Sequence, residues 1–212
     1  HWLSLRHYQK TDMNFNLTQI PDRIVKPREH GITMVMDKGL SLEEAKNFMS
    51  ISYPHVDMVK LGFGTAYVTP NLREKIEAYQ AYDIPVYFGG TLFEAFLIRN
   101  QFDDYVKMCK DYNINYMEVS DGSITIPHSE KCGYIEKLTK VGTVSSEVGS
   151  KDATQIIPPY IWIRSMNAEL EAGPPYGLAE AREAGDVGIY GGTGDARERV
   201  VQERLTGCRG IS

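Results

Sequence analysis

The chain has 212 residues, of which 42% are hydrophobic and 24% charged, which suffices for one domain with a sizeable core. Its net charge of -5 and its lack of a basic patch argue against nucleic acid as a partner. No apolar run approaches the roughly 20 residues that cross a bilayer, so no membrane contact is expected. Cys109, Cys132 and Cys208 match neither a zinc-binding pattern nor a disulfide framework, which favours a reducing cytoplasm.

Short strand-like runs and longer helical patterns alternate along the chain. The strand-like runs begin 24 to 32 residues apart, which is typical of repeated strand–helix units and predicts a parallel sheet. Ser41 and Glu44 form a capping-box pattern where the first helix begins. The predicted strands are 32–38, 56–62, 85–90, 116–122, 144–150 and 176–183. The predicted helices are 41–52, 70–83, 91–113, 128–140 and 161–173.

Most of the predicted strands place an ionisable side chain on the face opposite an apolar one. In the fourth strand, for example, Glu118 alternates with Met117 and Val119. An open sheet covered on both faces favours continuous apolar runs instead. The alternation therefore predicts an α/β fold of the (β/α) TIM-barrel type, with the charged groups inside the barrel near the carboxyl ends of the strands.

Seven charged residues lie late in a predicted strand or just after it. Burying so many charges without partners or a ligand costs free energy, so they form either a structural ion-pair network or a binding site. The carboxylates suit a hard cation such as Mg²⁺, and the lysines and the arginine suit an anion. The residues expected to converge are Asp37, Lys60, Glu118, Glu147, Lys151, Glu180 and Arg182.

Glycines mark a second feature of the predicted site. Gly89 and Gly90 precede Thr91 where the third helix is predicted to begin. Backbone N–H groups at the start of a helix favour an oxyanion, which makes these residues candidates for substrate binding. The alternative is a tight turn that requires glycine for its backbone conformation.

Six motifs, taken in this order, resemble the phosphosulfolactate synthase (ComA-type) family of coenzyme M biosynthesis, to which plant heat-stress-associated proteins are similar. The motifs are KPREHGITMVMDKGL, VDMVKLGFGTA, YFGGTLFEAF, YMEVSDGSITIP, SSEVGSKDA and AEAREAG. The resemblance runs from about Lys26 to about Val201. It implies a (β/α)₈ barrel that adds sulfite to phosphoenolpyruvate, with Mg²⁺, giving (2R)-phosphosulfolactate.

The resemblance also implies one catalytic role. Lys151 matches the lysine of the family's EVG-x-K motif, which implies that it is the general acid that protonates the carbon bearing the phosphate. Lys60 and Glu147 complete the predicted catalytic set. From charge and position, the predicted metal ligands, direct or through water, are Glu118, Glu147 and Glu180. The predicted substrate-binding residues are Asp37, Lys38, Gly89, Gly90, Thr91 and Arg182.

Two other functions stay open at this point. One is a non-catalytic, stress-linked relative that keeps the barrel for binding. The other is an aldolase-like enzyme that forms a Schiff base on Lys60 or Lys151.

The domain prediction has three parts: an N-terminal extension over 1–25, a barrel domain over 26–206 and a tail over 207–212. Six strands, where a barrel needs eight, predict an incomplete barrel that lacks strands seven and eight. Its two open strand edges favour association, so a homo-oligomer is expected.

Overall fold

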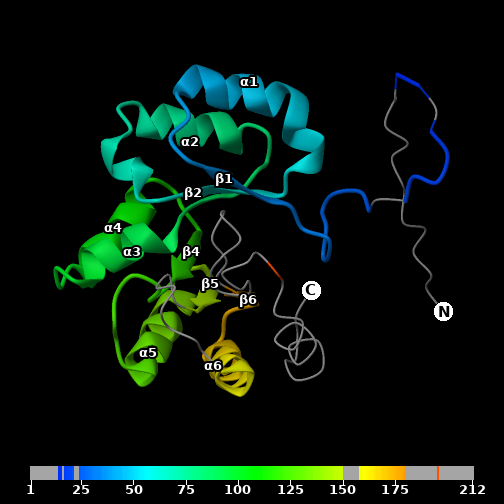
Figure 1. The fold of residues 1–212 in the computed structure, drawn as a ribbon. Coiled ribbons are helices and arrows are strands. Elements are labelled where there is room, and N and C mark those ends of the chain that lie inside the picture. Colours follow the sequence, from blue (N-terminus) through cyan, green and yellow to red (C-terminus); the bar gives the residue numbers. More distant parts are fainter. Residues whose placement is uncertain (1–13, 16, 22–23, 150–157, 180–194, 196–212) are drawn as a thin grey trace.

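The centre of the molecule is a curled sheet of six parallel strands that follow one another in chain order (Figure 1). It is seen in a computed structural model, which describes residues 14–15, 17–21, 24–149, 158–179 and 195. The strands confirm the predicted TIM-type architecture, and six of the eight strands of a full barrel lie in the described part. They are β1 (Met34–Asp37), β2 (Met58–Leu61), β3 (Val86–Phe88), β4 (Tyr116–Val119), β5 (Thr143–Val148) and β6 (Tyr176–Ala179).

The helices pack against one face of this sheet. Figure 1 shows α1 and α2 side by side near β1 and β2, and α5 and α6 side by side near the other edge. The helices are α1 (Leu42–Ser52), α2 (Leu72–Gln80), α3 (Gly90–Leu97), α4 (Phe102–Asp111), α5 (His128–Thr139) and α6 (Pro159–Glu171). Two short 3-10 helices, η1 (Tyr53–His55) and η2 (Thr65–Val68), follow α1 and β2.

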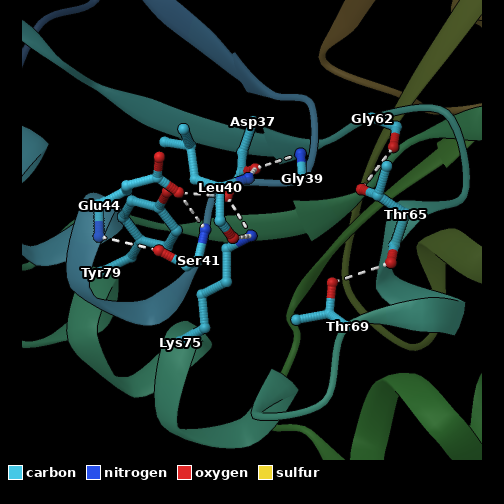
Figure 2. Close-up of polar contacts among 10 residues, drawn as sticks. All are labelled: Asp37, Gly39, Leu40, Ser41, Glu44, Gly62, Thr65, Thr69, Lys75 and Tyr79. Atoms are coloured by element: carbon cyan, nitrogen blue, oxygen red, sulfur yellow. Dashed lines mark hydrogen bonds and ion pairs between the residues drawn. The ribbon is translucent and has the colours of Figure 1, made fainter.

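Helix α1 begins as its sequence predicts. The Ser41 hydroxyl accepts a hydrogen bond from the backbone N–H of Glu44 at 3.3 Å, and the Glu44 carboxylate accepts one from the backbone N–H of Ser41 at 2.8 Å (Figure 2). Two N–H groups that the helix cannot satisfy internally thus receive partners. The capping box is therefore confirmed.

The single helix predicted over 91–113 is wrong, because the chain turns between α3 and α4. Asn100 adopts a left-handed backbone conformation with φ of 56°. The N–H groups of Asn100 and Gln101 bond back to the carbonyls of Leu97 and Phe96, which is the Schellman arrangement that ends a helix. Apolar periodicity continues across this turn, so the pattern of side chains does not reveal it.

One face of each strand supplies the core beneath the helices. Val59, Leu61, Phe88, Met117 and Val119 are each at most 1% exposed and belong to one large apolar cluster. A smaller cluster of Val148, Trp162 and Met166 joins β5 to α6. Because side chains alternate along a strand, the opposite, interior face carries the remaining positions, and the charged residues of β2, β4 and β5 lie there.

Candidate functional site

Three charged side chains meet on the interior face, near the carboxyl ends of β2, β4 and β5. The Nζ atom of Lys60 lies 2.7 Å from Oε1 of Glu118 and 3.4 Å from Oε2 of Glu147. All three residues are buried, and Glu118 is fully inaccessible. We call these residues the interior charge cluster. Their predicted convergence is confirmed, whereas their individual roles stay predictions.

Strand register explains why these residues meet. Lys60 is paired with Met36 on β1 and Tyr87 on β3, and Glu118 is paired with Ser145 on β5. Paired residues of parallel strands point to the same face, and Glu147 follows Ser145 by two positions. Alternation along each strand and pairing between strands therefore bring one cation and two carboxylates to the same interior face.

The environment of Glu118 is unusual for a carboxylate. Its Oε1 also accepts a hydrogen bond of 2.7 Å from the Gly90 N–H, while its buried Oε2 has no hydrogen-bond partner in the described part of the chain. Burial raises the pKa of Glu118 to about 7. The Lys60 ammonium acts against this rise, and the Glu147 carboxylate adds to it. Burial therefore favours the neutral form of Glu118, and Lys60 favours the charged form.

Lys60 stays protonated in this surrounding. Burial alone would lower the pKa of its ammonium, but the carboxylates of Glu118 and Glu147 outweigh burial and raise it. Burial also raises the pKa of the neighbouring Tyr87 hydroxyl, as do the two carboxylates, so this phenol stays neutral. The cluster thus presents one buried cation beside two carboxyl groups.

Asp37 does not join this cluster, so its predicted place among the interior residues is wrong. Register pairs Met36 with Lys60 and Asp37 with Leu61, which turns Asp37 toward the helices. Its carboxylate lies 2.7 Å from Nζ of Lys75 and accepts a 2.8 Å hydrogen bond from the Tyr79 hydroxyl (Figure 2). Backbone N–H groups of the β1–α1 turn complete a buried polar network between β1 and α2.

The substrate-binding role of Gly89, Gly90 and Thr91 stays a prediction, and the structure shows an internal contact at these positions. Gly89 caps α3, and the N–H of Gly90 is donated to Glu118, so this helix-terminal donor already has an anionic partner within the protein. Thr91 is half-buried in the first turn of α3, and Lys38 is exposed just after β1. The remaining predicted site residues lie outside the described residues: Lys151, Glu180 and Arg182.

Sequence reasoning missed a second buried charged group, which we call the Lys131 cluster: Lys131, Asp121 and Glu169. The Nζ atom of Lys131 lies 2.7 Å from Oδ1 of Asp121, 2.9 Å from Oε1 of Glu169 and 2.6 Å from the carbonyl oxygen of Glu147. Lys131 and Glu169 are each 1% exposed. A signal was present, since Lys131, Ile135 and Leu138 share one stripe of α5.

Other polar contacts organise the segment that follows β4. Glu94 of α3 accepts hydrogen bonds from the Ser120 hydroxyl and from the backbone N–H of Ser123. A cavity of about 360 Å³ lies between this segment, α5 and α6, with Lys131, Val148 and Gly149 among its lining residues. The carboxyl end of β5 therefore contributes to the lining of this cavity.

The interior charge cluster fits part of a magnesium site. Glu118 supplies a buried oxygen without a hydrogen-bond partner in the described part, Glu147 supplies a second carboxylate nearby, and Mg²⁺ prefers such ligands. Within the described residues, no group of three His, Cys, Asp or Glu side chains has the arrangement of a metal site. A third ligand would come from a substrate oxygen, water or the predicted Glu180.

Close packing around the cluster requires glycine at position 90. A Cβ atom there would overlap the Ser120 hydroxyl and would lie 2.6 Å from Cβ of Ser120 and 3.0 Å from Oε1 of Glu118. Gly90→Ala is therefore expected to lower the free energy of unfolding by about 1–3 kcal/mol, measured by urea denaturation. Gly133→Ala, on α5 with open space around its Cβ, is the control and should stabilise by about 0.5–1 kcal/mol. Equal effects of the two substitutions would contradict this view of the packing.

The parallel curled sheet and the buried charges at the carboxyl ends of its strands define an α/β protein of the TIM-barrel class, in which active sites lie at this end of the sheet. Residues 21–210 match the model of one family, described as "(2R)-phospho-3-sulfolactate synthase (ComA)". The chain belongs to this family. Among the described residues, no helix is both long and apolar enough to span a membrane.

Relatives from bacteria and archaea agree with this assignment. The chain is 34% identical over 196 residues to the phosphosulfolactate synthase of Bacillus subtilis, covering 92% of this chain and 78% of that protein. It is 38% identical over 184 residues to the phosphosulfolactate synthase of Methanothermobacter thermautotrophicus, covering 84% of this chain and 71% of that protein.

Solved structures support the fold. The 3-hexulose-6-phosphate synthase of Salmonella typhimurium aligns with a TM-score of 0.54 at 15% identity, covering 84% of this chain and 74% of that one. The 3-keto-L-gulonate-6-phosphate decarboxylase of Vibrio cholerae aligns with a TM-score of 0.54 at 13% identity, covering 85% of this chain and 75% of that one. At these identities the likeness concerns the fold alone.

Proposed function

We propose that this chain is a phosphosulfolactate synthase that joins sulfite to phosphoenolpyruvate, with Mg²⁺, to give (2R)-phosphosulfolactate. The observation that carries the proposal is the family match over residues 21–210, which includes every member of the interior charge cluster. Use of the product in coenzyme M formation and a cytoplasmic location belong to the same proposal.

The proposed reaction needs a site that handles negative charge. The sulfur of sulfite attacks the methylene carbon of phosphoenolpyruvate and forms the C–S bond, while the electron pair of the carbon–carbon double bond moves toward the carboxylate. The carbon bearing the phosphate then takes up a proton, which in this proposal comes from Lys151. When bound, Mg²⁺ would supply positive charge near the substrate carboxylate.

Lys60 has a direct part in this proposal. Its ammonium is a buried positive charge that Glu118 and Glu147 hold in place, so it can face a substrate oxyanion without having to be oriented first. Arg182 and Lys38 are proposed to hold the remaining anionic groups. Glu118 and Glu147, together with Glu180, are proposed as ligands of the cation.

The structure disfavours a Schiff base on Lys60. Such chemistry needs a neutral amine, whereas the two carboxylates raise the pKa of Lys60 and keep it an ammonium. Nothing in the described part of the chain favours the non-catalytic alternative, which the assay below distinguishes from the proposal.

We expect the chain to consume phosphoenolpyruvate and sulfite in equal amounts only when Mg²⁺ is present. Phosphorus NMR would follow loss of phosphoenolpyruvate and appearance of phosphosulfolactate, with chelator and then excess Mg²⁺ added as successive controls. Turnover should stop with chelator and return with Mg²⁺. Undiminished turnover in excess chelator would rule out the metal's role, and no turnover under any condition would favour the non-catalytic alternative.

A further inference from the structure

We infer that Lys131 is a positioning residue that holds Glu147 in contact with Lys60. The contact between Lys131 and Glu147 does not depend on the proposed function. Only the expected effect of this contact on turnover rests on that function. Lys131 lies on α5, and its side chain reaches Glu147 at the backbone carbonyl rather than at the carboxylate.

The geometry of Lys131 gives it three fixed partners. Its Nζ atom donates hydrogen bonds to Asp121 in the segment after β4 and to the carbonyl oxygen of Glu147 on β5. The same atom forms an ion pair with Glu169 on α6 at 2.9 Å. Lys131 and Glu169 are each 1% exposed, so their ion pair is buried. Lys131 therefore ties the end of β5 to two neighbouring elements.

Glu147 lies at the end of its strand, where a contact to its backbone carbonyl can set the position of its side chain. It is the penultimate residue of β5, and the next two residues, Val148 and Gly149, line the cavity of about 360 Å³. The contact from Lys131 thus adds to the packing of Val148 on Trp162 and Met166 at this end of the strand. The 3.4 Å distance between Glu147 and Lys60 is also the longer of the two contacts of Lys60, so a small shift of the backbone would break it.

A double-mutant cycle tests whether Lys131 acts through Glu147. We expect Lys131→Met to lower kcat about tenfold in the native background, with little change in the KM for phosphoenolpyruvate. In a Glu147→Gln background the same substitution should lower kcat much less, because substitutions of residues in contact have coupled effects. Lys75→Met is the matched control, since Lys75 is equally buried and paired but lies on α2, away from Glu147. Its effect should be the same in both backgrounds.

Carbon NMR of Glu147 provides a readout that needs no turnover. We expect the backbone carbonyl and side-chain carboxyl signals of Glu147 to shift in Lys131→Met and to stay in place in Lys75→Met. If Lys131→Met does not fold, Lys131→Met with Glu169→Gln removes the unpaired buried charge and is measured instead.

The two readouts separate failure of the inference from failure of the proposed function. The positioning role would be overturned if the Glu147 signals did not change in Lys131→Met. It would also be overturned if Lys131→Met lowered kcat by the same factor in both backgrounds. If the native chain shows no synthase activity, the proposed function fails, and the Glu147 signals alone decide whether Lys131 holds this residue.

Discussion

Lys60→Met is expected to lower turnover roughly 10²- to 10³-fold, the usual cost of removing one preorganised charge from an active site. The substitution keeps an unbranched apolar stem but removes the ammonium that lies 2.7 Å from Glu118 and 3.4 Å from Glu147. Two buried carboxylates then lack a cation, and an anionic substrate would meet a negative site. Steady-state kinetics on folded protein, verified by circular dichroism, provides the measurement.

Loss of stability must be separated from loss of charge in this experiment. The double variant Lys60→Met with Glu118→Gln removes one unpaired carboxylate, so its thermal stability should recover while its turnover stays low. Lys107→Met is the surface control, because Lys107 is exposed and pairs with exposed Asp111 on α4. Native turnover in Lys60→Met would show that the interior charge cluster is structural.

Asp37→Asn is expected to cost about 3–5 kcal/mol of folding free energy, because it breaks a buried ion pair and leaves the Lys75 ammonium without its counter-charge. For a chain of this length, that corresponds to a fall in Tm of roughly 6–20 °C. Glu43→Gln is the control, since Glu43 and Lys46 form an exposed pair, and its Tm should change far less. Similar changes for both variants would contradict the structural role of Asp37.

The same residue predicts a dependence of stability on pH. Burial acts to raise the pKa of Asp37, but hydrogen bonds from Lys75, Gly39, Leu40 and Tyr79 outweigh it and lower the pKa below its usual value. The folded chain therefore holds this carboxylate ionised more strongly than the unfolded chain does. Its contribution is present above the ordinary pKa of aspartate and is lost as pH falls through the lowered value.

Unfolding in urea at several pH values measures this contribution. The difference in unfolding free energy between native protein and Asp37→Asn should be constant from neutral pH to about pH 5 and should shrink at lower pH. A difference that persists unchanged into strong acid would show that the effect of Asp37 is not electrostatic.

The sequence predicted the strand faces only where one face is clearly apolar. In β4, Met117 and Val119 are apolar and Glu118 is not, so alternation identified the interior position correctly. In β1, the residues on both faces are largely apolar, since Met34 and Met36 alternate with Val35. Pairing with β2 placed Met36, rather than Asp37, on the interior face. The parity of a single strand cannot reveal that choice.

Local sequence patterns also do not predict which charged residues of neighbouring helices meet. Lys131 shares a stripe with Ile135 and Leu138, and Glu169 shares one with Trp162 and Met166, so each stripe contained a charged residue within an apolar face. The pattern indicates that such a residue is buried, but it does not name the partner. Only the packing of α5 on α6 brings Lys131 and Glu169 together.

The order of six strands, the parallel sheet and the presence of Lys60, Glu118 and Glu147 near strand ends could be predicted from the sequence, because they follow from periodicities of two and 3.6 residues within short segments. Strand register and helix packing set three further contacts: Tyr79 of α2 donates to Asp37, Gly90 donates to Glu118, and Lys131 donates to the carbonyl oxygen of Glu147. These contacts join residues 16 to 42 positions apart in the chain. They depend on strand register and helix packing, which the whole core sets together and no local segment encodes.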